Sequence, residues 1–158
     1  MLRPFYLAET AGFSCERAFR VYTKDILTYL NKGVSMIGQN ATHANFSVDD
    51  IEVAKTFYVD KLGFTVKRET PYDVMFESGA GTRFNVYTKK DHKPWDSTVF
   101  GIEVDNVKDA VDELKGKGIT VEKIDGTDES GIMSDPDMGD AAWFRDPAGN
   151  WICINSAK

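Results

Sequence analysis

Several residue types that carry common chemistry are scarce in this chain. It has two cysteines, Cys15 and Cys153, which lie far apart and fit no metal-binding or redox spacing. We therefore expect a reduced, cytoplasmic compartment. No stretch is apolar for long enough to cross a bilayer, and no run of Lys and Arg is interleaved with aromatic residues. Together with a net charge of −6, these absences argue against a membrane or a nucleic acid as partner.

One of only two histidines, His43, opens a stretch in which polar and apolar residues alternate. The stretch is "THANFSVDD", residues 42–50, and alternation of this kind predicts a half-buried β-strand. One face of this strand carries Ala44, Phe46 and Val48, and the other carries His43, Asn45 and Ser47. The role of a lone histidine on the polar face is the first question that the sequence raises.

The chain then repeats itself. The segment "HANFSVDDIEVAKTFYVDKLGFTVK" begins at His43, and "VFGIEVDNVKDAVDELKGKGITVEK" begins at Val99. In each copy a strand ends in Val-Asp, a helix runs to a glycine, and a strand containing Thr-Val follows. Two copies are too few and too long for a solenoid. We predict two similar halves, about 42–90 and 98–156, which share one core in a single domain over 36–158.

The first half reads as strand, helix and three strands. We predict a helix over 50–61, capped by Asp49 or Asp50 and ended by Gly63. Its predicted buried residues are Val53, Ala54, Phe57 and Tyr58. The stretches "FTVKRE", "YDVMFES" and "RFNVYTK" predict the three strands that follow.

The second half reads in the same order. We predict a helix over 107–117, capped by Asp105 or Asn106 and burying Val107, Val111 and Leu114. The predicted strands are "ITVEKI", "AAWFRD" and "WICINS", with a tight turn at "DPAGN" before the last. The acidic segment 126–140 is expected to be either a lid or a solvated connector.

Residues 1–35 lie outside the repeat. Within them, 14–32 has the apolar spacing of an amphipathic helix. The residues just before Met36 can be encoded by a purine-rich tract that resembles a bacterial ribosome-binding site, so one hypothesis is that translation starts at Met36. The alternative is a genuine helix that packs on the domain or on a dimer partner.

The two copies and the stretch "FRDPAGNWICI" resemble the glyoxalase / bleomycin-resistance / extradiol-dioxygenase superfamily, which has the vicinal oxygen chelate fold. The resemblance covers about residues 42–156. It implies an α+β fold in which paired βαβββ modules form a curved mixed sheet around a cleft, with the helices on the outer face. It also implies a homodimer. The activity does not follow from the fold, because the superfamily includes lyases, isomerases, dioxygenases and drug-binding proteins.

Metal-dependent members of this superfamily take one ligand from the first and one from the last strand of each half. The resemblance places these ligands on His43, Asn85, Val99 and Cys153. A hard or borderline divalent ion prefers nitrogen and oxygen donors, with carboxylates to offset its charge. An amide coordinates poorly and Val99 has no donor. We therefore expect no divalent metal and no other cofactor.

The same geometry would place one face of each sheet toward the cleft. The residues that we expect to contact a ligand there are His43, Asn45, Arg83, Asn85, Tyr87, Glu103, Trp143, Arg145, Trp151 and Cys153. The opposite face, which the helices cover, carries Phe46, Val48, Phe84, Val86, Phe100, Ile102, Val104, Ile152 and Ile154.

The polar face offers aromatic walls and positive charge. Its two tryptophans would form flat walls, or else pack across the sheet or at a dimer interface. Arg83 and Arg145 would hold a ligand anion, or else pair with Glu103 or Asp73.

Two residues on this face are candidates for catalysis. His43 is a candidate general base, or else a hydrogen-bonded remnant. Cys153 is a candidate nucleophile if His43 lowers its pKa, or else a small apolar filler.

The leading hypothesis is a metal-independent protein of this fold that binds a small aromatic or conjugated molecule, which can be anionic. Whether it is an enzyme stays open; if so, a relative of lactoylglutathione lyase or of the dioxygenases is expected. The first alternative is a metal-dependent lyase, isomerase or dioxygenase with a rearranged site of His43, Glu103 and Asp73 or Glu77. The second is a non-catalytic interaction module.

Overall fold

The computed structural model describes residues 37–156, and all of its helices and strands except one short turn lie in the compact unit that begins at Thr42. That turn is the 3-10 helix η1 (Ile37–Gln39). The predicted helix over 14–32 and the hypothetical start at Met36 lie outside the described residues.

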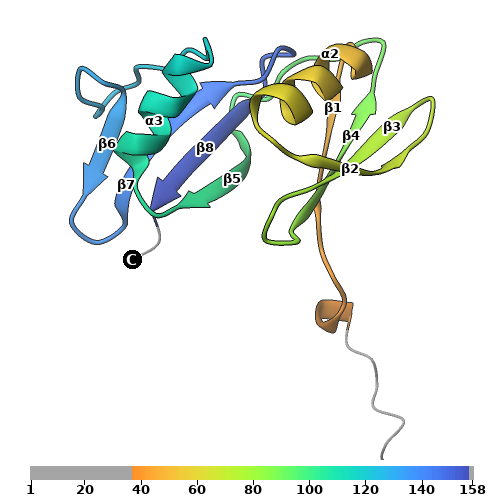
Figure 1. The fold of residues 1–158 in the computed structure, drawn as a ribbon, viewed down its shortest axis with the longest axis horizontal. Coiled ribbons are helices and arrows are strands. Elements are labelled where there is room, and N and C mark those ends of the chain that lie inside the picture. The colour runs from red at the N-terminus through yellow and green to blue at the C-terminus, as the bar shows by residue number, and fades with distance from the viewer. Residues whose placement is uncertain (1–36, 157–158) are drawn as a thin grey trace, which may run out of the picture. The chain divides into compact units, whose positions relative to one another are not determined.

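The compact unit consists of two βαβββ modules (Figure 1). The first module comprises β1 (Ala44–Val48), α2 (Ile51–Thr56), η2 (Phe57–Lys61), β2 (Thr65–Glu69), β3 (Asp73–Glu77) and β4 (Arg83–Thr88). The second comprises β5 (Thr98–Val104), α3 (Val107–Gly116), β6 (Ile132–Asp135), β7 (Gly139–Arg145) and β8 (Trp151–Ser156). The strand orders are β1-β4-β3-β2 and β5-β8-β7-β6, so the α+β prediction is confirmed.

Both helices begin at the predicted capping residues. The side chain of Asp50 accepts hydrogen bonds from the backbone N–H groups of Glu52 and Val53, and Asn106 caps α3 in the same way. A side-chain acceptor at this position satisfies N–H groups that the first turn of a helix leaves unpaired. α2 packs on β3 and β4, and α3 on β7 and β8. Within residues 37–156, no helix is long and apolar enough to span a membrane.

The predicted buried face of the first helix was wrong at one position. Phe57 and Tyr58 are buried, but Val53 is 48% exposed. The helix widens into a π turn at η2, where Leu62 N–H bonds to the carbonyl of Phe57, five residues earlier. A turn with an extra residue rotates the residues before it relative to those after it. A buried face predicted with the constant period of an α-helix is therefore wrong on one side of the turn.

Two predictions about the segments that pair with the edge of β7 were wrong. The segment "ITVEKI" is not a strand, because Val121 makes only an isolated bridge to Phe144. The rest of that edge is occupied by β6, which runs from Ile132 to Asp135 inside the segment 126–140 that we expected to be a lid or connector. Two short segments therefore share the edge that one strand, β2, covers in the first module.

A glycine fixes how β6 approaches this edge. Gly131 is buried and has a φ of 89°, and a Cβ atom there would lie 2.8 Å from Cγ1 of Val121. We expect Gly131→Ala to lower the free energy of unfolding by about 2 kcal/mol, because it adds both a clash and a left-handed alanine. Urea denaturation measures this.

The matched control is Gly116→Ala at the end of α3, where a Cβ would meet nothing within 4 Å. We expect this variant to gain about 0.5 kcal/mol from helix propensity. Equal losses in the two variants would contradict the role of Gly131.

The core is aromatic and extends from one module to the other. Phe84 stacks on Phe76 and Phe46, and its ring centroid lies 4.7 Å from that of Phe100. Phe100 comes from β5 and so reaches the first module from the second. Phe57 and Tyr58, which follow α2 in η2, pack against the sheet side of this core and are buried in it. Of the nine residues predicted on the apolar face, six are buried, whereas Phe100, Ile102 and Val104 of β5 are only partly buried.

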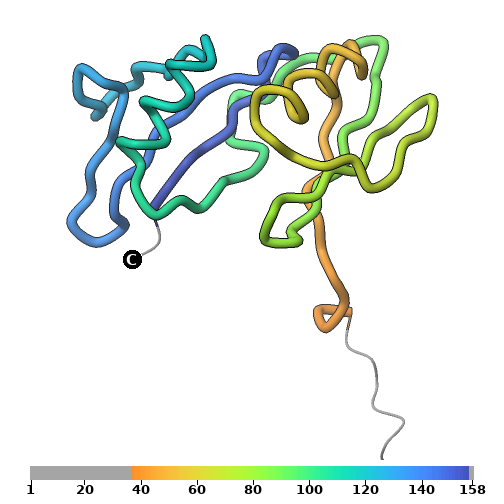
Figure 2. Tube along the Cα trace, in the orientation of Figure 1, coloured from red at the N-terminus to blue at the C-terminus, as the bar shows by residue number. Residues whose placement is uncertain are grey.

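A buried hydrogen-bond network also joins the modules. The hydroxyl of Tyr58 donates to Asp146 Oδ2 (2.9 Å), and Asn150 Nδ2 donates to the carbonyl of Ser47 (3.0 Å). Residues 89–97 run from the first module to the second (Figure 2). Within them, the His92 ring bonds to Ser47 Oγ (2.9 Å) and to the carbonyl of Ala148 (3.0 Å). The turn before β8 is thus held by the first module.

Candidate functional site

The polar face of the first sheet carries the residues that alternation predicts. The strand register places Asn45 and Met75 beside Asn85, and Asp73 beside Tyr87. Asn85 is 7% exposed, and its side-chain amide donates to Asn45 Oδ1 at 3.1 Å. These residues form an ordered polar surface on the side of the sheet that α2 does not cover.

Arg68 joins this face although the alternation along β2 would place it on the other side. The pairing of β2 with β3 shifts between Val66 and Arg68, so that Arg68 lies opposite Met75. Such a bulge adds a residue and re-aims the side chains beyond it. The guanidinium donates to both oxygens of Asp73, at 3.3 and 2.7 Å, and reaches Asn85 Oδ1 at 3.4 Å.

A second ion-pair group lies beside Arg68. Glu77 accepts from Lys67 Nζ at one oxygen and from Arg83 Nε at the other, both at 2.7 Å. Glu77 is therefore the partner of Arg83, in place of the expected Glu103 or Asp73. The hydrogen bonds from Lys67 and Arg83 lower the pKa of Glu77, and those from Thr70 and Arg68 lower the pKa of Asp73. Both carboxylates are thus ionised at neutral pH.

The polar face of the second sheet carries the tryptophans. The guanidinium carbon of Arg145 lies 3.8 Å from the ring centroid of Trp151, which is a cation–π contact. Arg145 Nε also lies 3.4 Å from Glu122 Oε1, so its carboxylate partner is again different from the ones expected. The indole N–H of Trp143 donates to Thr98 Oγ1 at 3.2 Å. Both tryptophans are only partly exposed.

The two candidate catalytic residues are not joined. His43 is exposed in the residue just before β1, and Cys153 is half-buried in β8, where its thiol contacts the carbonyl of Ile154 at 3.5 Å. No hydrogen bond links the two within the described residues. Burial raises the pKa of the Cys153 thiol, so the protonated thiol predominates at neutral pH and is a weak nucleophile.

The four positions that a metal would use offer few donors. The Asn85 amide is engaged at both ends, by Asn45 and Arg68. Val99 has no donor, and the Cys153 thiol is protonated. In the described part of the chain, no group of three His, Cys, Asp or Glu residues could hold a metal ion. The donors at these positions therefore do not match those that a divalent ion prefers.

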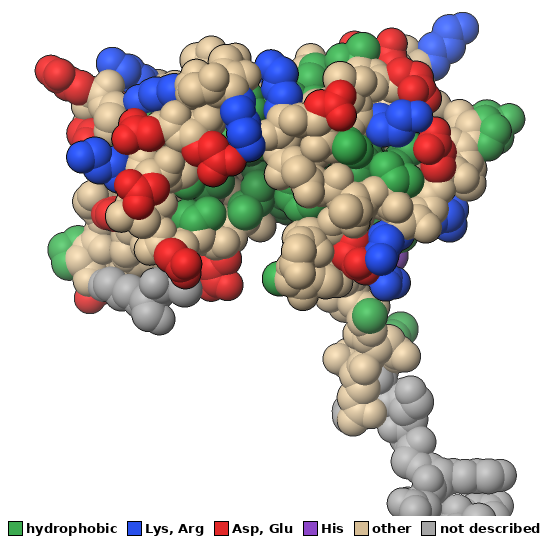
Figure 3. Space-filling model, in the orientation of Figure 1, with side chains coloured by type: hydrophobic (Ala, Val, Ile, Leu, Met, Phe, Trp, Pro, Cys, Tyr) green, Lys and Arg blue, Asp and Glu red, His purple; other side chains and the backbone are tan. Residues whose placement is uncertain are grey.

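A cavity of about 670 Å³ opens beside the aromatic core. Its apolar wall consists of Phe64, Phe84, Phe100 and Ile102. Figure 3 shows hydrophobic side chains gathered in the hollow between the two modules. The volume lies within the 300–1,000 Å³ that is usual for small-molecule sites.

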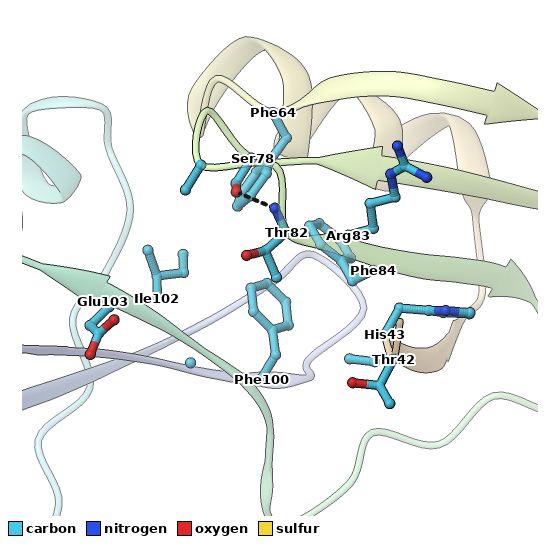
Figure 4. A pocket seen from close by; sticks show the side chains of 13 residues that line it. Thr42, His43, Phe64, Ser78, Thr82, Arg83, Phe84, Phe100, Ile102 and Glu103 are labelled. Atoms are coloured by element: carbon cyan, nitrogen blue, oxygen red, sulfur yellow. Dashed lines mark hydrogen bonds between the residues drawn. The ribbon is translucent and has the colours of Figure 1, made fainter. Parts of the chain in front are cut away.

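Three charged or titratable residues line the cavity beside these rings. In Figure 4, His43 and Arg83 lie on one side of Phe84 and Phe100, and Glu103 lies on the other. Glu103 is exposed and makes no hydrogen bond or ion pair with a described residue.

The expected ligand-contacting residues fall into separate groups. His43, Arg83 and Glu103 line the cavity. Asn45, Asn85 and Tyr87 lie on the polar face of the first sheet, and Trp143, Arg145, Trp151 and Cys153 on that of the second. Phe84, Phe100 and Ile102 line the cavity, although we expected them on the face that the helices cover. Phe64 and Arg68 were not expected in the site either. Phe64 is recognisable only from its position after a helix, and Arg68 only from a bulge that alternation does not reveal.

Known proteins resemble this chain in sequence pattern and in fold. A family model described as the Glyoxalase/Bleomycin resistance protein/Dioxygenase superfamily matches residues 40–154. A glyoxalase family protein from Enterococcus faecalis is 19% identical with a TM-score of 0.60, over 76% of this chain and 99% of that one. The lactoylglutathione lyase from Agrobacterium tumefaciens is 17% identical with a TM-score of 0.59, over 75% and 93%. A superfamily member from Sphaerobacter thermophilus is 23% identical with a TM-score of 0.58, over 75% and 97%. No curated protein matches the chain.

Proposed function

Because the chain belongs to the glyoxalase/bleomycin resistance protein/dioxygenase superfamily, where one fold hosts several activities, we propose that it binds a small organic molecule without a metal. The ligand has an aromatic or conjugated body. The observation that carries this proposal is the cavity of about 670 Å³ walled by Phe64, Phe84 and Phe100. Flat rings on several sides favour a flat, apolar ligand.

The packing of these rings supports a preformed site. Phe64 and Phe84 meet edge to face at 4.9 Å, and Phe84 stacks on Phe100. Phe84 is 4% exposed, so the wall is held by the core and not by mobile surface side chains. A site whose walls are fixed before binding loses little side-chain entropy when the ligand enters.

The donor set supports metal independence. The side-chain amide of Asn85 is hydrogen-bonded to Arg68 and Asn45, and the Cys153 thiol is protonated. Val99 has no atom that could coordinate a metal. We also propose a homodimer, since the cavity of one chain collects only His43, Arg83 and Glu103 of the ten expected residues. A second copy would add the remaining ones from its own sheets.

The test is binding of N-phenyl-1-naphthylamine, a neutral probe whose fluorescence rises in apolar sites. We expect saturable binding that excess EDTA does not change. Ala80 is an exposed residue that lines the cavity. Filling the mouth by Ala80→Trp is expected to weaken binding at least about tenfold, a loss of roughly 1.4 kcal/mol.

The matched control is Lys108→Trp, which places the same side chain on an exposed position of α3. It is expected to bind the probe like the unmodified protein. Unsaturable binding, or loss of binding with EDTA, would count against the proposal. Equal affinities of the two tryptophan variants would show that the probe binds elsewhere.

A further inference from the structure

Five charged side chains lie on the polar face of the first sheet, and the bulge in β2 places Arg68 among them. We call Lys67, Arg68, Asp73, Glu77 and Arg83 the Arg68 cluster. Without the bulge, Arg68 would lie opposite Val74, on the face that the helix covers; with it, Arg68 lies opposite Met75. Bulges are frequent next to functional sites, where they redirect a side chain.

The charges of the Arg68 cluster do not cancel. Three cations face two carboxylates, which leaves one positive charge on this face, whereas the whole chain has a net charge of −6. The carboxylates hold the guanidinium groups in place: Asp73 holds Arg68, and Glu77 holds Arg83. The groups are thus oriented before any ligand arrives.

Both guanidinium groups keep N–H donors for a ligand. Arg68 uses three of its five N–H donors, two on Asp73 and one on Asn85. Arg83 uses only Nε, on Glu77. No described residue takes the others. Planar forks of this kind match the oxygens of a carboxylate, sulfonate or phosphate.

The Arg68 cluster adjoins the aromatic cavity through Arg83, which lines the cavity. The ion pair of Arg68 and that of Arg83 are anchored on β3 four residues apart, at Asp73 and Glu77, which share a face and lie roughly 13 Å apart along a strand. Arg83 links the two regions, because it lines the cavity and is held by Glu77 on the polar face. One ligand can therefore place a ring in the cavity and a charged group on this face.

We propose that the Arg68 cluster is an oxyanion subsite, which selects aromatic ligands carrying a carboxylate, sulfonate or phosphate group. This inference rests on the proposed function, since it names the ligand class of the same site. Arg68 and Arg83 supply the N–H donors, and Asp73 and Glu77 position them.

The test compares two probes with one ring system. 8-Anilinonaphthalene-1-sulfonate carries a sulfonate that N-phenyl-1-naphthylamine lacks. We expect the sulfonate to bind about tenfold more tightly, worth roughly 1.4 kcal/mol. This preference should fall with added NaCl, because the side chains are exposed and salt screens them.

Two variants of the Arg68 cluster should change the preference in opposite directions. Arg68→Gln removes a positive charge and should abolish the preference. Asp73→Asn removes a negative charge and frees the guanidinium, so it should increase the preference several-fold. The control Lys108→Gln removes an exposed cation from α3 and should leave it unchanged.

Each outcome separates the two proposals. If neither probe binds, the proposed function fails and the subsite with it. If the neutral probe binds and the sulfonate binds no better, only the subsite is overturned. A parallel loss of sulfonate affinity in Arg68→Gln and Asp73→Asn would show a merely structural ion pair and would also overturn it.

Discussion

Replacing Asn150 by alanine is expected to lower the free energy of unfolding by about 3 kcal/mol. Asn150 is fully buried, and its Nδ2 donates both to the carbonyl of Ser47 and to Asp146 Oδ2. The alanine variant would leave that carbonyl without this donor and take one donor from a buried carboxylate. Asn150 Oδ1 has no partner in the described chain, so its removal offsets part of the loss. Urea denaturation followed by circular dichroism measures the change.

The matched control is Asn155→Ala on β8, the strand that directly follows Asn150, where the side chain makes no hydrogen bond with a described residue. Its loss should stay below about 0.5 kcal/mol, as for most sites without such features. Similar losses in the two variants would contradict the role of the network.

Tyr58→Phe should give an intermediate result. Burial and the nearby Asp146 raise the pKa of Tyr58 well above its ordinary value, so its hydroxyl is a donor to Asp146 at any physiological pH. Removing that hydroxyl should cost about 1.5 kcal/mol. Because both residues bond to Asp146, the losses of Tyr58→Phe and Asn150→Ala should not add.

Replacing Phe84 by alanine is expected to cost about 4 kcal/mol of unfolding free energy. The ring is 4% exposed and lies at the centre of the aromatic core. It stacks on Phe46, Phe76 and Phe100, and meets Tyr58 and Phe64 edge to face. Its loss removes apolar burial and leaves a cavity that neighbouring rings fill only in part.

Thermal and urea unfolding would measure this loss, with Tyr72→Ala as the control. Tyr72 is an aromatic residue of the same module that is 74% exposed, so its truncation should change stability by less than about 0.5 kcal/mol. Phe84→Leu should fall between the two. A loss below 1.5 kcal/mol for Phe84→Ala, in the range of conservative core swaps, would show that the rings are not a tightly packed core.

Much of the fold could be predicted from the sequence because each module repeats simple local rules. Alternation located β1, β4, β5 and β8, and the Val-Asp dipeptides located the starts of both helices. The glycines that end the helices, Gly63 and Gly118, have positive φ as a C-terminal stop requires. These signals depend on residues close together in the chain, so no knowledge of tertiary packing was needed.

The errors occur where the backbone departs from a constant period. The π turn rotated Val53 out of the core, and the bulge at Val66 and Arg68 reversed the alternation along β2. The strand β6 was not recognised because local propensity does not show which segment pairs with β7. That pairing forms over Ile132–Asp135 and not over "ITVEKI".

The candidate site was predicted less completely for the same reason. Arg83 was expected on the polar face and lies there, but its partner Glu77 depends on the register between β3 and β4. Arg68 depends on the bulge. His92, the second histidine, lies in the linker and carries no local signal, yet it bonds to both modules. The roles of the other expected ligand-contacting residues stay predictions.

Phe100 belongs to the second module by its place in the chain and to the first by its packing. If the chain were cut within residues 89–97 and the modules separated, Phe46 and Phe84 would lose their stacking contacts with Phe100. The ring of Phe100 would then be exposed to solvent. Although the chain is built from two copies of one pattern, neither copy has a complete interior of its own. We therefore expect the two modules to unfold in one cooperative transition, and truncation of Phe100 on β5 to destabilise the first sheet as well.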